Sequence, residues 1–158
     1  MIIHIERNLL PDDWPTPLWA KFEEAYEVPT WLVRWAKNPC DMLFRGYSEH
    51  ISTLAYLLLY FSPNICLQRV EVEELNPIKD PETDREYRLL WGGKYPTLSD
   101  VLFITDVVGT TNDWLQKQIK KVVKARRSAR KLTIIHFLDN ITSWEALRID
   151  IPLLLEVE

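Results

Sequence analysis

Residues 101–113 constrain the fold of this chain more than any other segment. The apolar run Val101–Ile104 is followed by the acid Asp106, then by a small polar loop at 109–112 and by a helical pattern. Four consecutive apolar residues suit a strand that is buried on both faces of a parallel sheet. The free backbone N–H groups of a tight loop and the dipole of the next helix favour an anion. The segment therefore predicts a buried strand that ends at an anion-binding loop.

Strand-like and helix-like segments alternate along the rest of the chain. We expect further strands at 1–5, 41–47, 65–73, 87–91, 132–138 and 149–157, and helices at 18–26, 31–37, 48–60 and 115–131, with Ser48 as an N-cap. This alternation predicts a three-layer α/β fold, with a mainly parallel sheet and helices on both faces. We expect a single domain, 1–158, in which 75–86 forms an exposed, mobile loop because it carries two prolines and six charges.

Composition limits the class of protein. The longest apolar stretch, Leu54–Phe61, is far shorter than the ~20 residues that a membrane-spanning helix needs, and the N-terminus lacks a signal-peptide pattern. Cys40 and Cys66 are isolated, which favours two reduced thiols over zinc ligands or a disulfide. We therefore expect a cytoplasmic protein that does not enter a membrane.

The segment Lys117–Lys131 is strongly basic, although the net charge of the chain is −4. It holds eight cations and no acid, while Leu115, Ile119, Val122 and Val123 recur at helical spacing. The favoured interpretation is a helix with one core face and solvated cations toward its C-terminus. A surface that attracts DNA, RNA or phosphate is the alternative.

The segment around Asp106 resembles the PRPP-binding signature of the type I phosphoribosyltransferases, in which a buried strand runs into acids, small residues and a Thr/Gly loop. Asp106, Val107, Val108, Gly109, Thr110 and Thr111 stand in those places. The pair Arg45-Gly46 stands where that family has an early pyrophosphate loop, and 75–86 stands where it has a closing loop. The resemblance implies a phosphoribosyltransferase-like fold and transfer of phosphoribose from PRPP to a nucleobase, with release of pyrophosphate.

The resemblance also implies a set of site residues. Asp106 would hold the ribose hydroxyls and Arg45 the pyrophosphate as catalytic residues, and Mg²⁺ would be held mainly by the substrate. The remaining substrate-binding residues would be Gly46, Val108, Gly109, Thr110, Thr111, Asn112, Lys79, Arg85 and Arg88. The implied partners are PRPP or another ribose phosphate and a nucleobase, and a homodimer is left open.

Two other functions remain open from the residues. Asp84 and Glu86 lie in an acidic run that would hold a divalent ion for a nuclease, with the basic helix 117–131 on DNA. Thr105 stands where the resemblance has its first acid, which favours a non-catalytic module that binds a ligand or a partner. His136 lies within an apolar strand and is expected to be a hydrogen-bonded core histidine rather than a base.

Overall fold

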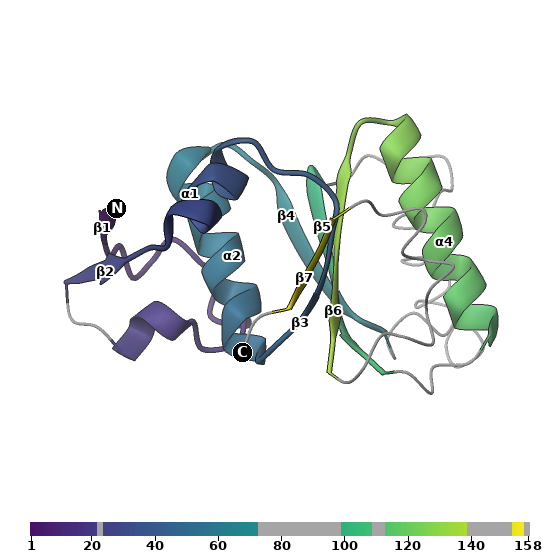
Figure 1. Cartoon of the computed structure of the whole chain (residues 1–158), viewed down its shortest axis with the longest axis horizontal. Coiled ribbons are helices and arrows are strands. Elements are labelled where there is room, and N and C mark those ends of the chain that lie inside the picture. The colour runs from purple at the N-terminus through teal and green to yellow at the C-terminus, as the bar shows by residue number, and fades with distance from the viewer. Residues whose placement is uncertain (22–23, 73–98, 109–112, 139–152, 157–158) are drawn as a thin grey trace. The chain divides into compact units, whose positions relative to one another are not determined.

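The computed structural model describes residues 1–21, 24–72, 99–108, 113–138 and 153–156 (Figure 1). The chain divides into two compact units that interleave along the sequence. The first unit is made of Met1–Cys40 and Tyr47–Ile65, and the second of Asp41–Gly46 and Cys66–Glu158. Each unit is described by itself below.

The second unit is built on a five-stranded sheet in the order β4-β5-β6-β3-β7. Its strands are β3 (Met42–Arg45), β4 (Leu67–Glu71), β5 (Val101–Val107), β6 (Leu132–Phe137) and β7 (Leu153–Glu156). Every neighbouring pair runs parallel. The predicted α/β class with a parallel sheet is therefore confirmed.

Helix α4 (Asp113–Ser128) packs on one face of this sheet and runs alongside β6 in Figure 1. Its buried stripe and the inward residues of the strands form one apolar cluster: Leu43, Val70, Val72, Leu102, Ile104, Val107, Leu115, Ile119, Val122, Val123, Ile135 and Phe137. Each fully buried side chain of this kind stabilises the fold by roughly 1.5–3 kcal/mol. Met42, Phe44 and Phe103, on the opposite face, are also buried, which explains why these strands are apolar without alternation.

Arg126 is the exception to the prediction that the cations of the basic segment are solvated. Only 2% of it is exposed. Its guanidinium donates to the carbonyl oxygen of Leu132 at 2.8 Å, to that of Ser99 at 3.0 Å and to Thr133 Oγ1 at 3.2 Å. Burial lowers the pKa of Arg126 to about 10, against the attraction of Asp41 and Asp100. Arg126 thus ties α4 to the start of β6 and to Ser99, two residues before β5.

Two acids at the beginning of the strands pair with the end of the basic segment. Asp41 accepts from Arg127 Nη2 at 3.2 Å and from the backbone N–H of Thr133 at 2.9 Å. Asp100 accepts from Lys131 Nζ and from the N–H of Cys66, each at 2.8 Å. These contacts lower the pKa of Asp100, with the Lys131 hydrogen bond as the largest cause. The charges of Arg127 and Lys131 are therefore paired within the fold.

The first unit combines a small antiparallel pair with helices. β1 (Ile2–His4) pairs with β2 (Ala25–Glu27), and η1 (Leu18–Lys21), α1 (Thr30–Lys37) and α2 (Ser48–Phe61) complete it. Eight consecutive residues of α2, 51–58, are buried, as in a helix enclosed on all sides. Tyr56 hydroxyl donates to the carbonyl of His4 at 3.1 Å and accepts from the N–H of Glu6 at 2.8 Å. This tyrosine fixes β1 to α2.

Three expectations about these elements need comment. The predicted helix at 18–26 is wrong, because 25–27 pairs with β1 and only one 3-10 turn remains. Ser48 is the first residue of α2, whereas the extended Tyr47 (φ −76°, ψ 151°) occupies the N-cap without a side-chain bond. The predicted strand at 87–91 and the mobile loop at 75–86 lie outside the described residues.

Replacing Arg126 with Met tests the importance of its hydrogen bonds. We expect a loss of about 2–4 kcal/mol in the free energy of unfolding, because the carbonyls of Ser99 and Leu132 would lose their buried donor. Urea unfolding measures the loss. Lys124→Met, on the exposed side of the same helix, is the control and should change stability by about 0.5 kcal/mol or less. Equal losses in the two variants would contradict the role of Arg126.

Candidate functional site

The carboxyl end of β5 carries a β-bulge. Ile104 pairs with Ile135 and Val107 with Phe137, so that Thr105 and Asp106 stand opposite the single residue His136. Asp106 has φ 63°, in the left-handed region that Asp tolerates better than most residues. Its side chain is 38% exposed at the edge of the sheet. The bulge therefore turns one carboxylate outward at the end of a central strand.

His136 joins the ends of three strands. It is 1% exposed on β6, and its Nε2 lies 2.7 Å from the carbonyl oxygen of Gly46, which directly follows β3. Because a carbonyl only accepts, Nε2 carries the proton. Nδ1 then accepts from the N–H of Asp106 at 3.4 Å and lies 3.8 Å from Asp106 Oδ1. His136 is thus the hydrogen-bonded core histidine that the sequence predicts.

The charge state of this histidine follows from its surroundings. Burial lowers the pKa of His136, and the Gly46 carbonyl and the Asp106 carboxylate oppose that shift. The ring is therefore neutral at pH 7, with both nitrogens engaged. His136 holds the ends of the strands in position. The outward carboxylate of Asp106 is the group that can accept a hydrogen bond from a hydroxyl, an ammonium group or water.

This histidine lies at the topological switch point of the sheet. β3 and β6 are neighbours, but the chain leaves β3 toward β4 on one side and leaves β6 toward β7 on the other. Open parallel sheets bind ligands outside the carboxyl ends of their strands at such a point. The end of β3, the end of β6 and the bulge of β5 therefore form the candidate site.

The structure brings together part of the predicted residue set. Gly46 and Asp106 both contact His136, and Arg45 is the last residue of β3. Val108 directly follows β5. The other members lie outside the described residues: Gly109, Thr110, Thr111, Asn112, Lys79, Arg85, Arg88, Asp84 and Glu86. His136 was not predicted as a site residue, although a polar side chain at the end of an apolar strand was the signal for it.

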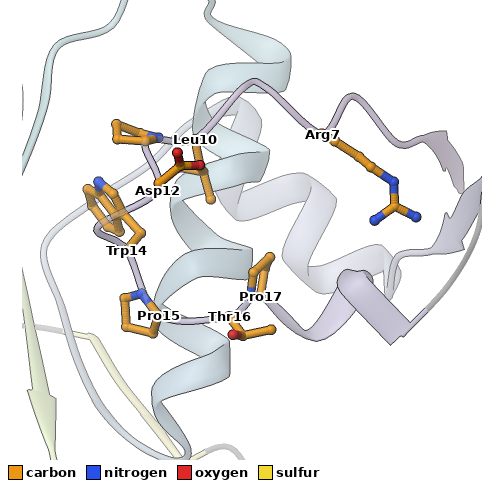
Figure 2. Close-up of a pocket in the computed structure, with 8 residues that line it drawn as sticks. Arg7, Leu10, Asp12, Trp14, Pro15, Thr16 and Pro17 are labelled. Atoms are coloured by element: carbon orange, nitrogen blue, oxygen red, sulfur yellow. The ribbon is translucent and has the colours of Figure 1, made fainter.

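A pocket of about 190 Å³ lies in the first unit, in the segment between β1 and η1. Figure 2 shows the labelled side chains that line it, from Arg7 to Pro17. Three prolines fix the backbone of this segment, and Trp14 adds an aromatic wall. It is a hollow with mixed polar and apolar walls, separate in sequence from the strand ends described above.

Within the described ranges, no group of three or more His, Cys, Asp or Glu side chains could hold a metal ion. None of the helices described there is both long and apolar enough to cross a membrane.

Comparisons with known proteins identify solved structures that share the fold of this chain. No protein-family model matches the chain, and no curated protein does. Domain III of the replication initiation protein DnaA from Thermotoga maritima superposes with a TM-score of 0.56 at 16% identity, over 80% of this chain and 59% of that one. AMPPCP-bound DnaA from Aquifex aeolicus gives 0.57 at 12%, over 84% and 48%. DnaA bound to AMPPCP and single-stranded DNA gives 0.56 at 14%, over 84% and 48%. The chain thus spans about half the length of these neighbours and shares their fold.

These neighbours correct the resemblance drawn from the sequence. The phosphoribosyltransferase assignment is wrong, and with it PRPP or ribose phosphate and a nucleobase as partners and phosphoribosyl transfer as the reaction. A role in phosphoribosyl-based nucleotide metabolism is likewise wrong, and neither the nuclease nor a non-catalytic module of that fold is supported. The physical reason is that a buried strand that ends in an acid and a polar loop is typical of parallel sheets in general. Membership of a particular family depends on the order of the strands in the sheet.

Substituting Asp106 tests the backbone of the bulge. Asp106→Val should lower the free energy of unfolding by about 1–2 kcal/mol more than Asp106→Asn, because a β-branched residue is strained at φ 63° and Asn is not. Chemical unfolding of both variants gives the comparison. Equal stability of the two would show that residue 106 does not hold the left-handed conformation.

The neutral His136 predicts a specific dependence of stability on pH. Since its pKa is lower folded than unfolded, the unfolded chain binds more protons below about pH 6.5, and stability falls as pH falls through that value. His136→Gln keeps a donor for Gly46 but does not titrate. Unfolding measured from pH 8 to pH 5 should show a smaller loss in this variant than in the wild type. Parallel curves would contradict a buried neutral histidine.

Proposed function

We propose that this chain is a DnaA-like protein that binds single-stranded nucleic acid through the exposed face of α4. One observation carries the proposal: the aromatic and cationic side chains of this helix share one stripe. Trp114, Lys117, Lys121 and Lys124 are all exposed. At 100° per residue they fall within about 80° of one another and opposite the buried stripe. We call these four residues the α4 stripe.

The stripe differs from the other cations of the basic segment. Arg126 is buried against backbone carbonyls, Arg127 pairs with Asp41, and Lys131 pairs with Asp100. The three lysines of the α4 stripe lie on the side of the helix opposite Arg126 and extend over about 10 Å of helix. They supply a local positive charge on a chain whose net charge is −4.

This combination suits single strands more than duplexes. Exposed bases stack on aromatic side chains, and lysines neutralise the phosphates without reading sequence. Trp114 is 41% exposed and lies next to the lysines in the α4 stripe. A structural neighbour described as DnaA bound to single-stranded DNA supports this class of ligand. A function linked to replication initiation follows from the same likeness.

Several finer expectations belong to this proposal. A three-layer arrangement is supported by burial on both faces of the sheet. Mg²⁺ would accompany the phosphates of the ligand rather than a protein cage, as its preference for phosphate and water suggests. We place the protein in the cytoplasm as one functional domain, with Arg45 as a candidate phosphate contact at the carboxyl ends of the strands and with Gly46 and Asp106 as candidate contacts there for a hydroxyl or an ammonium group.

Charge reversal on the α4 stripe tests the proposal. Lys117→Glu combined with Lys121→Glu should weaken binding of a labelled oligo-dT at least tenfold in fluorescence anisotropy. The slope of log K against log salt should become shallower by about 1.4, since each phosphate contact contributes about 0.7 for single strands. Arg34→Glu combined with Lys37→Glu, on exposed positions of α1, makes the same change in net charge. Equal losses in the two double variants would contradict a local site.

Removing the aromatic ring tests the preference for single strands. Trp114→Ala should cost about 1–3 kcal/mol of binding to oligo-dT, the contribution of one stacked base, and should leave binding to duplex DNA nearly unchanged. Trp114→Phe is the matched control because it keeps a ring of smaller area. An equal effect of Trp114→Ala on single-stranded and duplex DNA would argue against stacking.

A further inference from the structure

The fold raises the question of whether this chain binds a nucleotide. Two structural neighbours are described as DnaA bound to AMPPCP, an analogue of ATP. In parallel α/β folds, a triphosphate is held by a glycine-rich turn between a strand and the next helix, with the pattern Gly-x-x-x-x-Gly-Lys-Ser/Thr. The glycines allow backbone N–H groups to surround the phosphates, and the lysine reaches the terminal phosphates. In this chain the turn at the switch point, between β3 and α2, contains Gly46, and we compare the pattern from that residue.

The residues that follow Gly46 do not fit this cradle. Ile51 stands in the place of the second glycine and Ser52 in the place of the lysine, and only Thr53 matches. Ile51 and Ser52 are 1% and 0% exposed within α2. The hydroxyl of Thr53 donates to the carbonyl of Glu49 at 3.0 Å, so it is engaged within its own helix. Neither the backbone approach nor the lysine of a phosphate cradle is present in this segment.

The length of the turn points the same way. β3 ends at Arg45 and α2 begins at Ser48, so two residues connect them. A loop that wraps a phosphate is longer, because several consecutive N–H groups must point inward. Among the described residues 38–72 there is no lysine. Arg45 is the cation at the carboxyl end of β3, and Asp106 adds negative charge near the end of β5, whereas Glu71 at the end of β4 pairs with Arg69 at 3.8 Å.

A hydrogen bond joins two strand ends at the switch point, where a phosphate would bind. His136 Nε2 donates to the Gly46 carbonyl at 2.7 Å and so ties the end of β6 to the end of β3. This hydrogen bond directs the carbonyl oxygen of Gly46 at the buried imidazole. The carboxylate of Asp106 lies on the other side of the same imidazole, and its negative charge repels a polyanion.

From these observations we infer that the chain does not hold a nucleoside triphosphate at the turn after β3, and that its nucleic-acid binding is independent of nucleotide. The first part rests on residues 45–53, Asp106 and His136. The second part also rests on the proposed function. The chain thus has the fold of its AMPPCP-bound neighbours. At its switch point, the His136–Gly46 hydrogen bond joins the strand ends in place of a phosphate-binding loop.

Thermal unfolding with AMPPCP and Mg²⁺ tests the first part. We expect the Tm of the full chain to change by less than 1 °C at millimolar AMPPCP. A ligand at a hundred times its Kd would raise the Tm of a domain of this size by roughly 5–10 °C. The charge-reversed variant of Lys117 and Lys121 separates weak attraction to the α4 stripe from a true site. A saturable rise that persists in this variant would overturn the inference, whereas a rise lost in it supports the inference.

Anisotropy with oligo-dT tests the second part. The Kd should agree within twofold with and without AMPPCP and Mg²⁺, and a tenfold tightening by the nucleotide would overturn nucleotide independence. The two proposals fail in different ways. Absence of oligo-dT binding would overturn the proposed function and nucleotide independence with it. A flat Tm in that case would still support the absence of a triphosphate site.

Discussion

The parallel pairing of β5 with β6 is the contact on which the rest of the second unit depends. Both strands are buried on both faces, so their side chains meet α4 on one side and further buried residues on the other. The bulge at Thr105–Asp106 interrupts this pairing at its carboxyl end and turns a carboxylate outward. Core packing and site geometry therefore come from the same pair of strands.

Polar contacts at both ends of the sheet complement this apolar core. At the amino ends, Arg126 bonds to backbone carbonyls, and Asp41 and Asp100 pair with Arg127 and Lys131. At the carboxyl ends, His136 links β6 to Gly46 and to Asp106. Burial makes each of these contacts costly to leave unmade. The basic segment is consequently divided into cations that serve the fold and lysines that remain exposed.

Local signals were strong enough to predict most elements of the second unit. Val101–Ile104 and the apolar run at 132–138 form β5 and β6, because an uninterrupted apolar run suits a strand enclosed on both faces. Local signals were misleading at 18–26. The C-terminal end of this segment pairs with β1, and this pairing outweighs the helical periodicity. The family resemblance failed for a similar reason: it rested on one strand, loop and helix, and strand order is a property of the whole sheet.

By itself, the sequence determined the α/β class, the buried parallel strands, the basic helix with its apolar stripe and the core position of His136, because each depends on a local pattern of apolar and polar residues. Only the tertiary structure decided the strand order, the burial of Arg126, the bulge that places Asp106 beside His136 and the hydrogen bond of His136 to Gly46. These features join residues 6 to 90 positions apart. Contacts over such distances depend on how the strands assemble, which no local pattern encodes.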